Sequence, residues 1–170
     1  MNTITADGLT LEPQTAAHAD EMFLILSDAA LYEFENEPPP SSAWLRERFS
    51  KLETRRSADG EEAWLNWVIR LTGGELIGYV QATIRKDRSA MIAYVLGSRY
   101  WGRGYANRAV RTMMNELAGQ YGVRDFLAIF KRANVRSRRL LDRLGFSEAG
   151  TELGSQIDIE PDEVLMEARQ

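Results

Sequence analysis

Residues 99–106 read Arg99-Tyr100-Trp101-Gly102-Arg103-Gly104-Tyr105-Ala106 and join two elements of different hydrophobic period. Before them, residues 91–96 form a short apolar run rich in β-formers, which predicts a strand. After them, apolar side chains recur at helical spacing until Gly122, which predicts a long helix. Glycines at a strand-to-helix turn let backbone N–H groups approach a ligand, and the first helical turn adds unpaired donors and partial positive charge. The turn therefore suits a pyrophosphate, with a purely structural role for the glycines as the alternative.

Two familiar phosphate-binding motifs fit this turn poorly. A P-loop requires Gly-Lys followed by Ser or Thr, and the sequence contains no such triplet here. A dinucleotide fingerprint needs a third small residue where Asn107 stands, and a carboxylate at the end of the next strand. Asp125 lies at a suitable sequence distance but opens that strand. Nucleoside triphosphate and Rossmann-type binding are therefore disfavoured.

Outward from this turn, the chain alternates strands and helices. We expect strands at 9–13, 67–71, 76–84, 91–96, 126–130, 146–151 and 164–168, and helices at 15–27, after the triple proline 38–40, after the glycine turn, and between Asn134 and Gly145. The crossover from 91 to 130 makes its two strands parallel. The predicted fold is α/β (α+β), with a mixed, mostly antiparallel central sheet of about seven strands flanked by about four helices. One domain spanning residues 1–170 is expected.

Composition excludes several kinds of chemistry. The 170 residues include no cysteine and one histidine, His18. Disulfides, thiolate metal sites and cysteine nucleophiles are therefore ruled out, and little remains for zinc or a Ser-His-Asp triad, so we predict no metal. His18 is interpreted as a surface or core residue. No apolar run reaches the length that a bilayer requires, and the N-terminus lacks a secretory signal. A cytoplasmic protein without membrane contact is expected.

The charge of the chain is unevenly distributed. Residues 99–143 contain eleven Lys or Arg and three acids, a net +8, so the remainder must be −12 to give the overall −4. One interpretation is a solvated basic face, and the other is a site for a polyanion. Nucleic acid is not expected as a partner, because the rest of the surface would repel it.

The motifs together resemble the GNAT (Gcn5-related) N-acetyltransferase superfamily. The resemblance rests on Arg99-x-x-Gly102-x-Gly104 before an amphipathic helix, then Asn134-x-x-Ser137 and Leu-Gly-Phe at 144–146. It is strongest to the ribosomal-protein-alanine N-acetyltransferase (RimJ/RimL-like) subgroup. It implies the acyl-CoA N-acyltransferase fold and acetyl-CoA as cosubstrate. The implied cofactor-binding residues are Tyr94, Val95, Leu96, Arg99, Gly102, Arg103, Gly104, Tyr105, Ala106 and Asn134.

The same resemblance implies direct attack of an amine on the thioester, without an acyl-enzyme. Many relatives place a tyrosine acid where this chain has Leu141, and Ser137 is the expected substitute. No carboxylate lies on the strand at 91–96, so the loop acids Glu33, Glu35 and Glu37 are the candidate bases, with a merely solvated acidic loop as the alternative. Tyr94 and Tyr32 are candidate hydroxyl groups in the pocket.

The resulting hypothesis is an N-acetyltransferase that moves an acetyl group from acetyl-CoA to a primary amine, either a protein or peptide N-terminus or a small amine. Two alternatives remain at this level: a non-catalytic CoA-binding regulatory module, and an acyltransferase that uses a longer acyl-CoA. A monomer or a homodimer is expected. The acidic remainder of the chain weakly favours a cationic acceptor.

Overall fold

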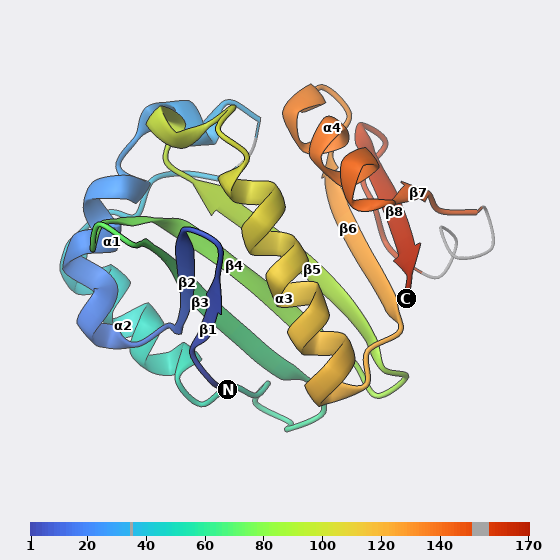
Figure 1. Ribbon diagram of the computed structural model, residues 1–170, viewed down its shortest axis with the longest axis horizontal. Helices are drawn as coiled ribbons and strands as arrows, with labels where there is room; N and C mark the ends of the chain where they lie inside the picture. The colour runs from blue at the N-terminus through green and yellow to red at the C-terminus, as the bar shows by residue number, and fades with distance from the viewer. Residues whose placement is uncertain (35, 151–156) are drawn as a thin grey trace.

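The computed structural model describes residues 1–34, 36–150 and 157–170. Within them, the strands form one sheet in the order β1-β2-β3-β4-β5-β6-β8-β7, and only β5 and β6 pair in parallel (Figure 1). The strands are β1 (Ile4–Ala6), β2 (Leu9–Pro13), β3 (Ala63–Leu71), β4 (Leu76–Ile84), β5 (Ser89–Leu96), β6 (Asp125–Lys131), β7 (Ser147–Glu148) and β8 (Glu163–Arg169). The predicted mixed, mostly antiparallel α/β class is confirmed.

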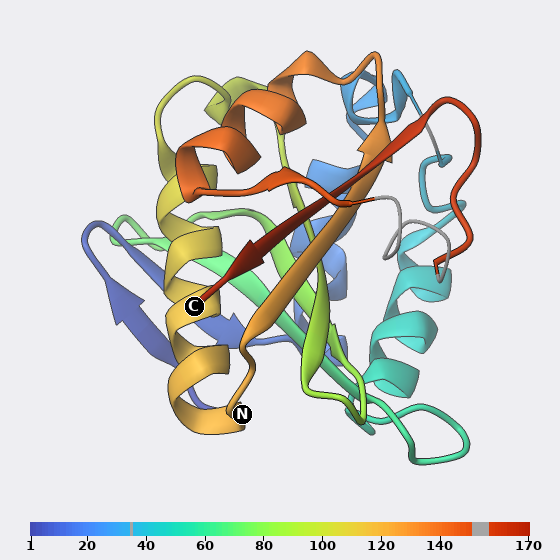
Figure 2. The ribbon, with the colours of Figure 1, turned by 90° about the vertical axis from the view of Figure 1, so that its right-hand side faces the viewer.

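Helices cover both faces of this sheet. The longer helices are α1 (Ala19–Leu26), α2 (Ser42–Leu52), α3 (Tyr105–Tyr121) and α4 (Val135–Leu144), and three short 3-10 turns are η1 (Ala16–His18), η2 (Ala29–Tyr32) and η3 (Ser98–Tyr100). Figure 2 looks along the sheet, with α3 on one side and α2 on the other. None of the helices in the described ranges combines the length and apolar character needed to cross a bilayer.

The two faces bury separate apolar clusters. The stripe of α3 that the sequence predicted, including Ala109, Val110, Met113 and Leu117, is buried against the larger cluster with β2 to β6. Residues of α1 and α2 pack with Val68 and Leu76 in the smaller cluster on the opposite face. Both faces of the sheet are buried because each helix packs one apolar stripe against it.

Helix ends follow the capping residues that the sequence identified. The Ser41 hydroxyl accepts a hydrogen bond from the N–H of Trp44 at 3.1 Å, and α2 begins at the next residue. Gly122 (φ 66°) ends α3 and Gly145 (φ 88°) ends α4 in the left-handed conformation. Glycine is favoured there because it has no β-carbon to clash.

Three local predictions differ from the structure. The described residues contain eight strands, because β1, which was not predicted, pairs with β2 across a turn at Asp7-Gly8. The first helix begins as a 3-10 turn, so α1 starts at Ala19 rather than at residue 15. Of the strand expected at 146–151, residues 147–148 form β7, and residue 151 lies outside the described ranges.

The parallel pair β5–β6 separates after a short region of contact. Pairing extends from Ser89 opposite Asp125 to Met91 opposite Leu127. Beyond that point β5 continues alongside β4 to Leu96, whereas β6 continues alongside β8 to Lys131, and the two strands diverge (Figure 1). Within the described ranges, no strand pairs with the β6-facing edge of β5 beyond Met91, and we call this part of β5 its open edge.

Gly78 on β4 is required where β5 approaches this opening. A β-carbon at Gly78 would lie 2.0 Å from the Val95 carbonyl oxygen and 2.8 Å from the Leu96 Cα, both backbone atoms that cannot rotate away. We predict that Gly78→Ala lowers the free energy of unfolding by about 2 kcal/mol or more. The control is Gly119→Ala inside α3, where nothing lies within 4 Å of the added carbon. It should stabilise the protein by about 0.5–1 kcal/mol. Equal stability of both variants in urea denaturation would contradict the close approach.

Candidate functional site

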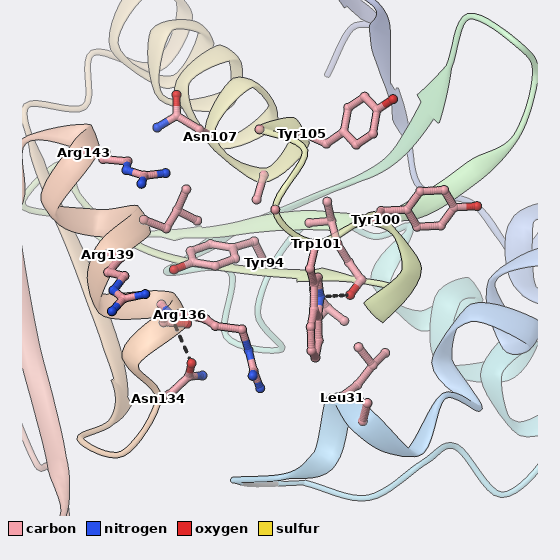
Figure 3. Close-up of a pocket in the computed structure, with 18 of the residues that line it drawn as sticks. Leu31, Tyr94, Tyr100, Trp101, Tyr105, Asn107, Asn134, Arg136, Arg139 and Arg143 are labelled. Atoms are coloured by element: carbon pink, nitrogen blue, oxygen red, sulfur yellow. Dashed lines mark hydrogen bonds between the residues drawn. The ribbon is translucent and has the colours of Figure 1, made fainter.

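A cavity of about 440 Å³ lies at the open edge of β5 (Figure 3). Its wall combines the end of β5, the glycine turn, the first turn of α3, the exposed side of α4 and the η2 segment. The residues are Ala30, Leu31, Phe34, Tyr94, Val95, Leu96, Tyr100, Trp101, Gly102, Gly104, Tyr105, Ala106, Asn107, Asn134, Arg136, Ser137, Arg139, Leu140 and Arg143. Segments distant in the sequence therefore meet where β5 and β6 part.

Backbone groups of β5 point into this opening at alternate residues. The Gly97 N–H donates to the Ile77 carbonyl of β4 at 3.0 Å, and the register continues with Leu96 opposite Gly78. Since hydrogen-bonded and non-hydrogen-bonded pairs alternate along antiparallel strands, Leu96 and Tyr94 direct their N–H and C=O groups away from β4, whereas Val95 directs its groups toward it. The Leu96 carbonyl accepts a hydrogen bond from the Trp101 indole at 2.8 Å, drawn as a dashed line in Figure 3.

The glycine turn presents its backbone without obstruction. Gly102 (φ 73°) and Gly104 (φ 78°) adopt left-handed conformations, and a β-carbon at either would meet nothing within 4 Å. Gly104 is the N-cap of α3, and no side chain of the described residues caps this helix N-terminus. The first N–H groups of a helix have no partner within it, so those after Gly104 remain available to a ligand. A 17-residue helix adds partial positive charge there.

Three arginines of α4 border the cavity, and none of them was predicted as a site residue. Arg136, Arg139 and Arg143 follow Asn134 at spacings that put them on one side of a helix. In Figure 3 the side chain of Arg143 extends from α4 toward the side occupied by α3, and Arg139 lies between Arg143 and Asn134. The helical spacing in 136–143 was the signal that could have identified them.

The two arginines predicted from the turn itself lie elsewhere. Arg99 forms an ion pair with Glu75 at 2.6 Å, and its guanidinium carbon lies 4.8 Å from the Tyr100 ring centre. Arg103 is exposed in the turn. Neither side chain lines the cavity, although the predicted Gly102, Gly104, Tyr105 and Ala106 all do.

Arg136 bridges the opening between α4 and the η2 segment. Its guanidinium carbon lies 4.2 Å from the Trp101 ring centre and 5.7 Å from that of Phe34. Its Nη2 atom lies 2.5 Å from the Glu33 carboxylate. Glu33, a candidate base, is therefore exposed and paired with a cation. Glu35, another candidate, lies outside the described residues.

Asp28 holds the η2 segment beside the end of β5. Its carboxylate accepts hydrogen bonds from the Ser98 N–H at 2.9 Å and from the Ala30 N–H at 3.1 Å. The interactions with Ser98, and secondarily the bond from Ala30, lower the pKa of Asp28 below its usual range. A charged Asp28 at neutral pH therefore keeps the Glu33 region over the cavity.

A second cavity of about 610 Å³ lies under α2, on the opposite face of the sheet. It shares with the first a wall made of Leu31, Phe34, Tyr94, Val95, Asn134 and Ser137. Glu37 and Tyr32 border only this second cavity. The Tyr32 hydroxyl donates to the Leu26 carbonyl at 2.6 Å, and burial raises the pKa of Tyr32.

Tyr94 and Ser137 meet in the wall that the two cavities share. Burial raises the pKa of Tyr94 to about 12, and the hydrogen bond with Ser137 offsets only part of this effect. Asn134 caps α4 by accepting the Ser137 N–H at 3.1 Å. Leu141, at the position where the family resemblance implies a tyrosine, is buried with 1% exposure. At neutral pH the Tyr94 phenol is therefore a neutral hydrogen-bond donor.

His18 takes no part in this arrangement. Its Nδ1 accepts the Thr15 N–H at 3.0 Å, and its Nε2 lies 3.4 Å from Glu12. It lines neither cavity. The structure therefore gives it a role in closing the first helical turn.

The splayed parallel pair, with a glycine turn and an uncapped helix beside it, defines the fold class of acyl-coenzyme A N-acetyltransferases. Residues 8–147 match the family model described as an acetyltransferase (GNAT) domain. The chain therefore belongs to the GNAT family, whose members are acyl-CoA-dependent N-acetyltransferases.

Individual relatives are distant. The curated relative "Uncharacterized N-acetyltransferase p20" from Bacillus licheniformis is 24% identical over 152 residues, covering 88% of this chain and 85% of its own length. The solved structure of RimL, a ribosomal alpha-N-protein acetyltransferase in complex with coenzyme A, superposes with a TM-score of 0.80 at 18% identity, covering 99% of this chain and 98% of RimL. Spermidine N-acetyltransferase from Vibrio cholerae, in complex with CoA and spermine, gives 0.77 at 19% identity, covering 97% of both chains. These similarities confirm the fold and its likeness to the RimJ/RimL-like subgroup.

Proposed function

We propose that the protein transfers the acetyl group of acetyl-CoA to a primary amine, a protein or peptide N-terminus or a small amine, with both substrates bound at once. The observation that carries this proposal is the wall common to the two cavities, which contains Tyr94 and Val95 at the end of β5. A cofactor in one cavity and an amine in the other would meet there. Holding two reactants side by side removes much of the entropic barrier to their reaction.

The 440 Å³ cavity fits the chemical groups of coenzyme A. The N–H groups after Gly104 and the space beside Gly102 suit a pyrophosphate, since anions bind at uncapped helix N-termini. Arg139 and Arg143 supply positive charge for further phosphate groups. The open backbone edge at Tyr94 and Leu96 suits the amide groups of pantetheine, which extend like a peptide strand. Asn134 would border that arm while it caps α4.

Acetyl-CoA supplies a thioester whose carbon gains a bond to the amine nitrogen as its bond to sulfur breaks, which leaves coenzyme A as the thiol. A backbone N–H on the open edge of β5 would polarise the thioester carbonyl. The Tyr94 phenol would donate a proton, or a hydrogen bond, where negative charge develops on sulfur. Its raised pKa keeps that proton in place at neutral pH. Ser137 would orient the phenol and reprotonate it through solvent.

The acceptor must lose a proton before it reacts. An α-amino group with a pKa of about 8 is mostly protonated at pH 7. Glu37 is the one carboxylate of the described residues that lines the second cavity, and we assign it the role of accepting that proton through water. The pairing of Glu33 with Arg136 suits it better to holding the η2 segment.

Amine-dependent release of thiol from acetyl-CoA tests the proposed function. Peptide amides, monoamines and diamines are offered in turn, and mass spectrometry identifies the acetylated product. We expect turnover with at least one amine, and faster turnover with acetyl-CoA than with octanoyl-CoA. Tight binding of coenzyme A with no turnover on any amine would overturn the proposal in favour of a CoA-binding regulatory module.

Gly104→Val tests the placement of the pyrophosphate. The valine side chain would cover the N–H groups of α3, so we predict that the Kd for acetyl-CoA rises at least tenfold in calorimetry. Gly60→Val is the control, because Gly60 has nearly the same φ (74° against 78°) and an equally open β-carbon position. Both variants should lose similar stability from backbone strain, about 1–2 kcal/mol. A common Kd for the two variants would remove the α3 N-terminus from the cofactor site.

Tyr94→Phe tests the proposed acid. We expect kcat to fall about 100-fold while the Kd for acetyl-CoA changes less than about threefold, because the ring stays and the proton donor is lost. Ser137→Ala should reduce kcat less, about fivefold. Tyr121→Phe at the end of α3 is the matched control, since its phenol is also partly buried but lines neither cavity. An undiminished kcat in Tyr94→Phe would exclude the phenol from the reaction.

A further inference from the structure

Three carboxamide side chains lie in a row in the second cavity, under α2. Asn66 on β3 is directly opposite Gln81 on β4, and Gln81 is directly opposite Ala93 on β5. Gln14, just past β2, donates its backbone N–H to the Asn66 carbonyl at 2.9 Å, which extends the row by one strand. All three carboxamides line the 610 Å³ cavity. Since neighbouring strands are about 4.8 Å apart, the row from Gln81 to Gln14 is roughly 10 Å long, and its far end lies roughly 14 Å from β5.

Gln14 and Asn66 are buried and Gln81 is partly buried, yet their side chains lack partners within the described residues. Gln14 and Asn66 are 6% and 8% exposed, and no side-chain hydrogen bond links Gln14, Asn66 or Gln81 to another described residue. Ser89, another buried polar residue, differs because its hydroxyl donates to Asp87 at 2.7 Å. Within the described ranges, the Tyr100 hydroxyl is the one unpaired side-chain polar atom sealed from solvent. The three carboxamides are therefore open to the cavity rather than enclosed.

An unpaired buried amide is unfavourable unless something in the cavity completes its hydrogen bonds. Each carboxamide offers two donors and one acceptor oxygen. A row of such groups provides a neutral surface that can form hydrogen bonds with neutral polar groups of a ligand but cannot neutralise a charge on it. A ligand amide or hydroxyl would both donate to it and accept from it.

The charged residues of the same cavity also favour a neutral ligand group. Among its described residues, Glu37 is the one carboxylate and Arg48 the one cation. Arg48 is exposed on α2, with its guanidinium carbon 5.6 Å from the Trp44 ring centre. A second ammonium group on the acceptor would enter a cavity that already holds a cation and has no spare carboxylate among these residues. Burying such a charge without a partner is costly.

We propose that the row Gln14–Asn66–Gln81 selects the acceptor: a primary amine that carries a neutral amide or hydroxyl group along its chain, rather than a polyamine. This inference rests on the proposed acetyl transfer and adds the element that determines acceptor specificity. The amine nitrogen lies beside Tyr94 and Val95, and the tail crosses the sheet under α2. Ala93, with its small side chain, leaves the space through which the tail reaches Gln81.

A set of four acceptors with five carbon atoms each tests this selection. They are 5-aminopentanamide, 5-aminopentanol, pentylamine and 1,5-diaminopentane, which differ only in a terminal carboxamide, hydroxyl, methyl or ammonium group. With saturating acetyl-CoA, we expect kcat/KM for the carboxamide or the hydroxyl acceptor to exceed that for pentylamine about tenfold, as one or two neutral hydrogen bonds allow. 1,5-Diaminopentane should be the poorest substrate. The comparison of carboxamide with hydroxyl identifies which neutral group the row binds.

Gln81→Met and Asn66→Leu remove the amides at nearly constant volume. Each variant should abolish most of the preference for the carboxamide or hydroxyl acceptor over pentylamine. The kcat/KM for pentylamine should stay within about twofold of wild type, and the KM for acetyl-CoA should be unchanged. The Tm should stay equal or rise, since no hydrogen bond to another described residue is lost. Gln120→Met, an exposed position on α3, is the control and should retain the wild-type preference.

The possible failures are distinguishable. Turnover that is fastest with 1,5-diaminopentane, or equal with all four acceptors, would overturn the selection by the row and leave acetyl transfer intact. If both variants keep the wild-type preference for the neutral polar acceptors, the row does not select the acceptor. If that preference is kept while the Tm falls by several degrees, the carboxamides stabilise the sheet and do not bind the acceptor. Absence of thiol release with every amine would overturn both proposals.

Discussion

The site depends on the separation of β5 from β6 after Met91 and Leu127. Each strand keeps a partner on its other side, β4 for β5 and β8 for β6, so the sheet stays continuous while its middle opens. The backbone groups on the inner edge of β5 lose their pairing, which is unfavourable for buried amides unless another group replaces the neighbouring strand. Trp101 replaces it at the Leu96 carbonyl. In the proposed function, the remaining groups of this edge bind the amide groups of the cofactor.

The other parts of the site lie around the opening between β5 and β6. Gly102 and Gly104 turn the chain from β5 into α3, so the N-terminus of α3 comes to the same opening. On the opposite side, α4 follows β6, and its Arg136 reaches back to Trp101 and Glu33. The Asp28 carboxylate fixes η2 to Ser98, directly after β5. The opening is therefore bordered on three sides by segments that the strand separation brings together.

Local signals in the sequence were sufficient for the elements that depend on neighbouring residues. Ser41, Asn134, Gly122 and Gly145 mark helix ends by capping chemistry, and the period of α3 identifies its buried stripe. Features that depend on strand register could not be predicted in this way. Asn66 and Gln81 become neighbours only because β3 and β4 pair in one particular register. The pairing of Glu33 with Arg136 likewise joins residues 103 positions apart, so no local pattern distinguishes Glu33 from the acids beside it.

The position of Tyr94 follows from the same geometry. The family resemblance implies a tyrosine at position 141, but Leu141 fills that position with a buried apolar side chain, and α4 carries no phenol. Tyr94 on β5 is opposite Val80 on β4, and its phenol reaches Ser137 on α4 across the opening. A hydroxyl can therefore be brought from the strand to the helix surface, provided the strands separate far enough to admit an aromatic ring. In the proposed reaction, what matters is where the proton donor lies relative to the thioester. A phenol on strand β5 can therefore take the place of a phenol on helix α4.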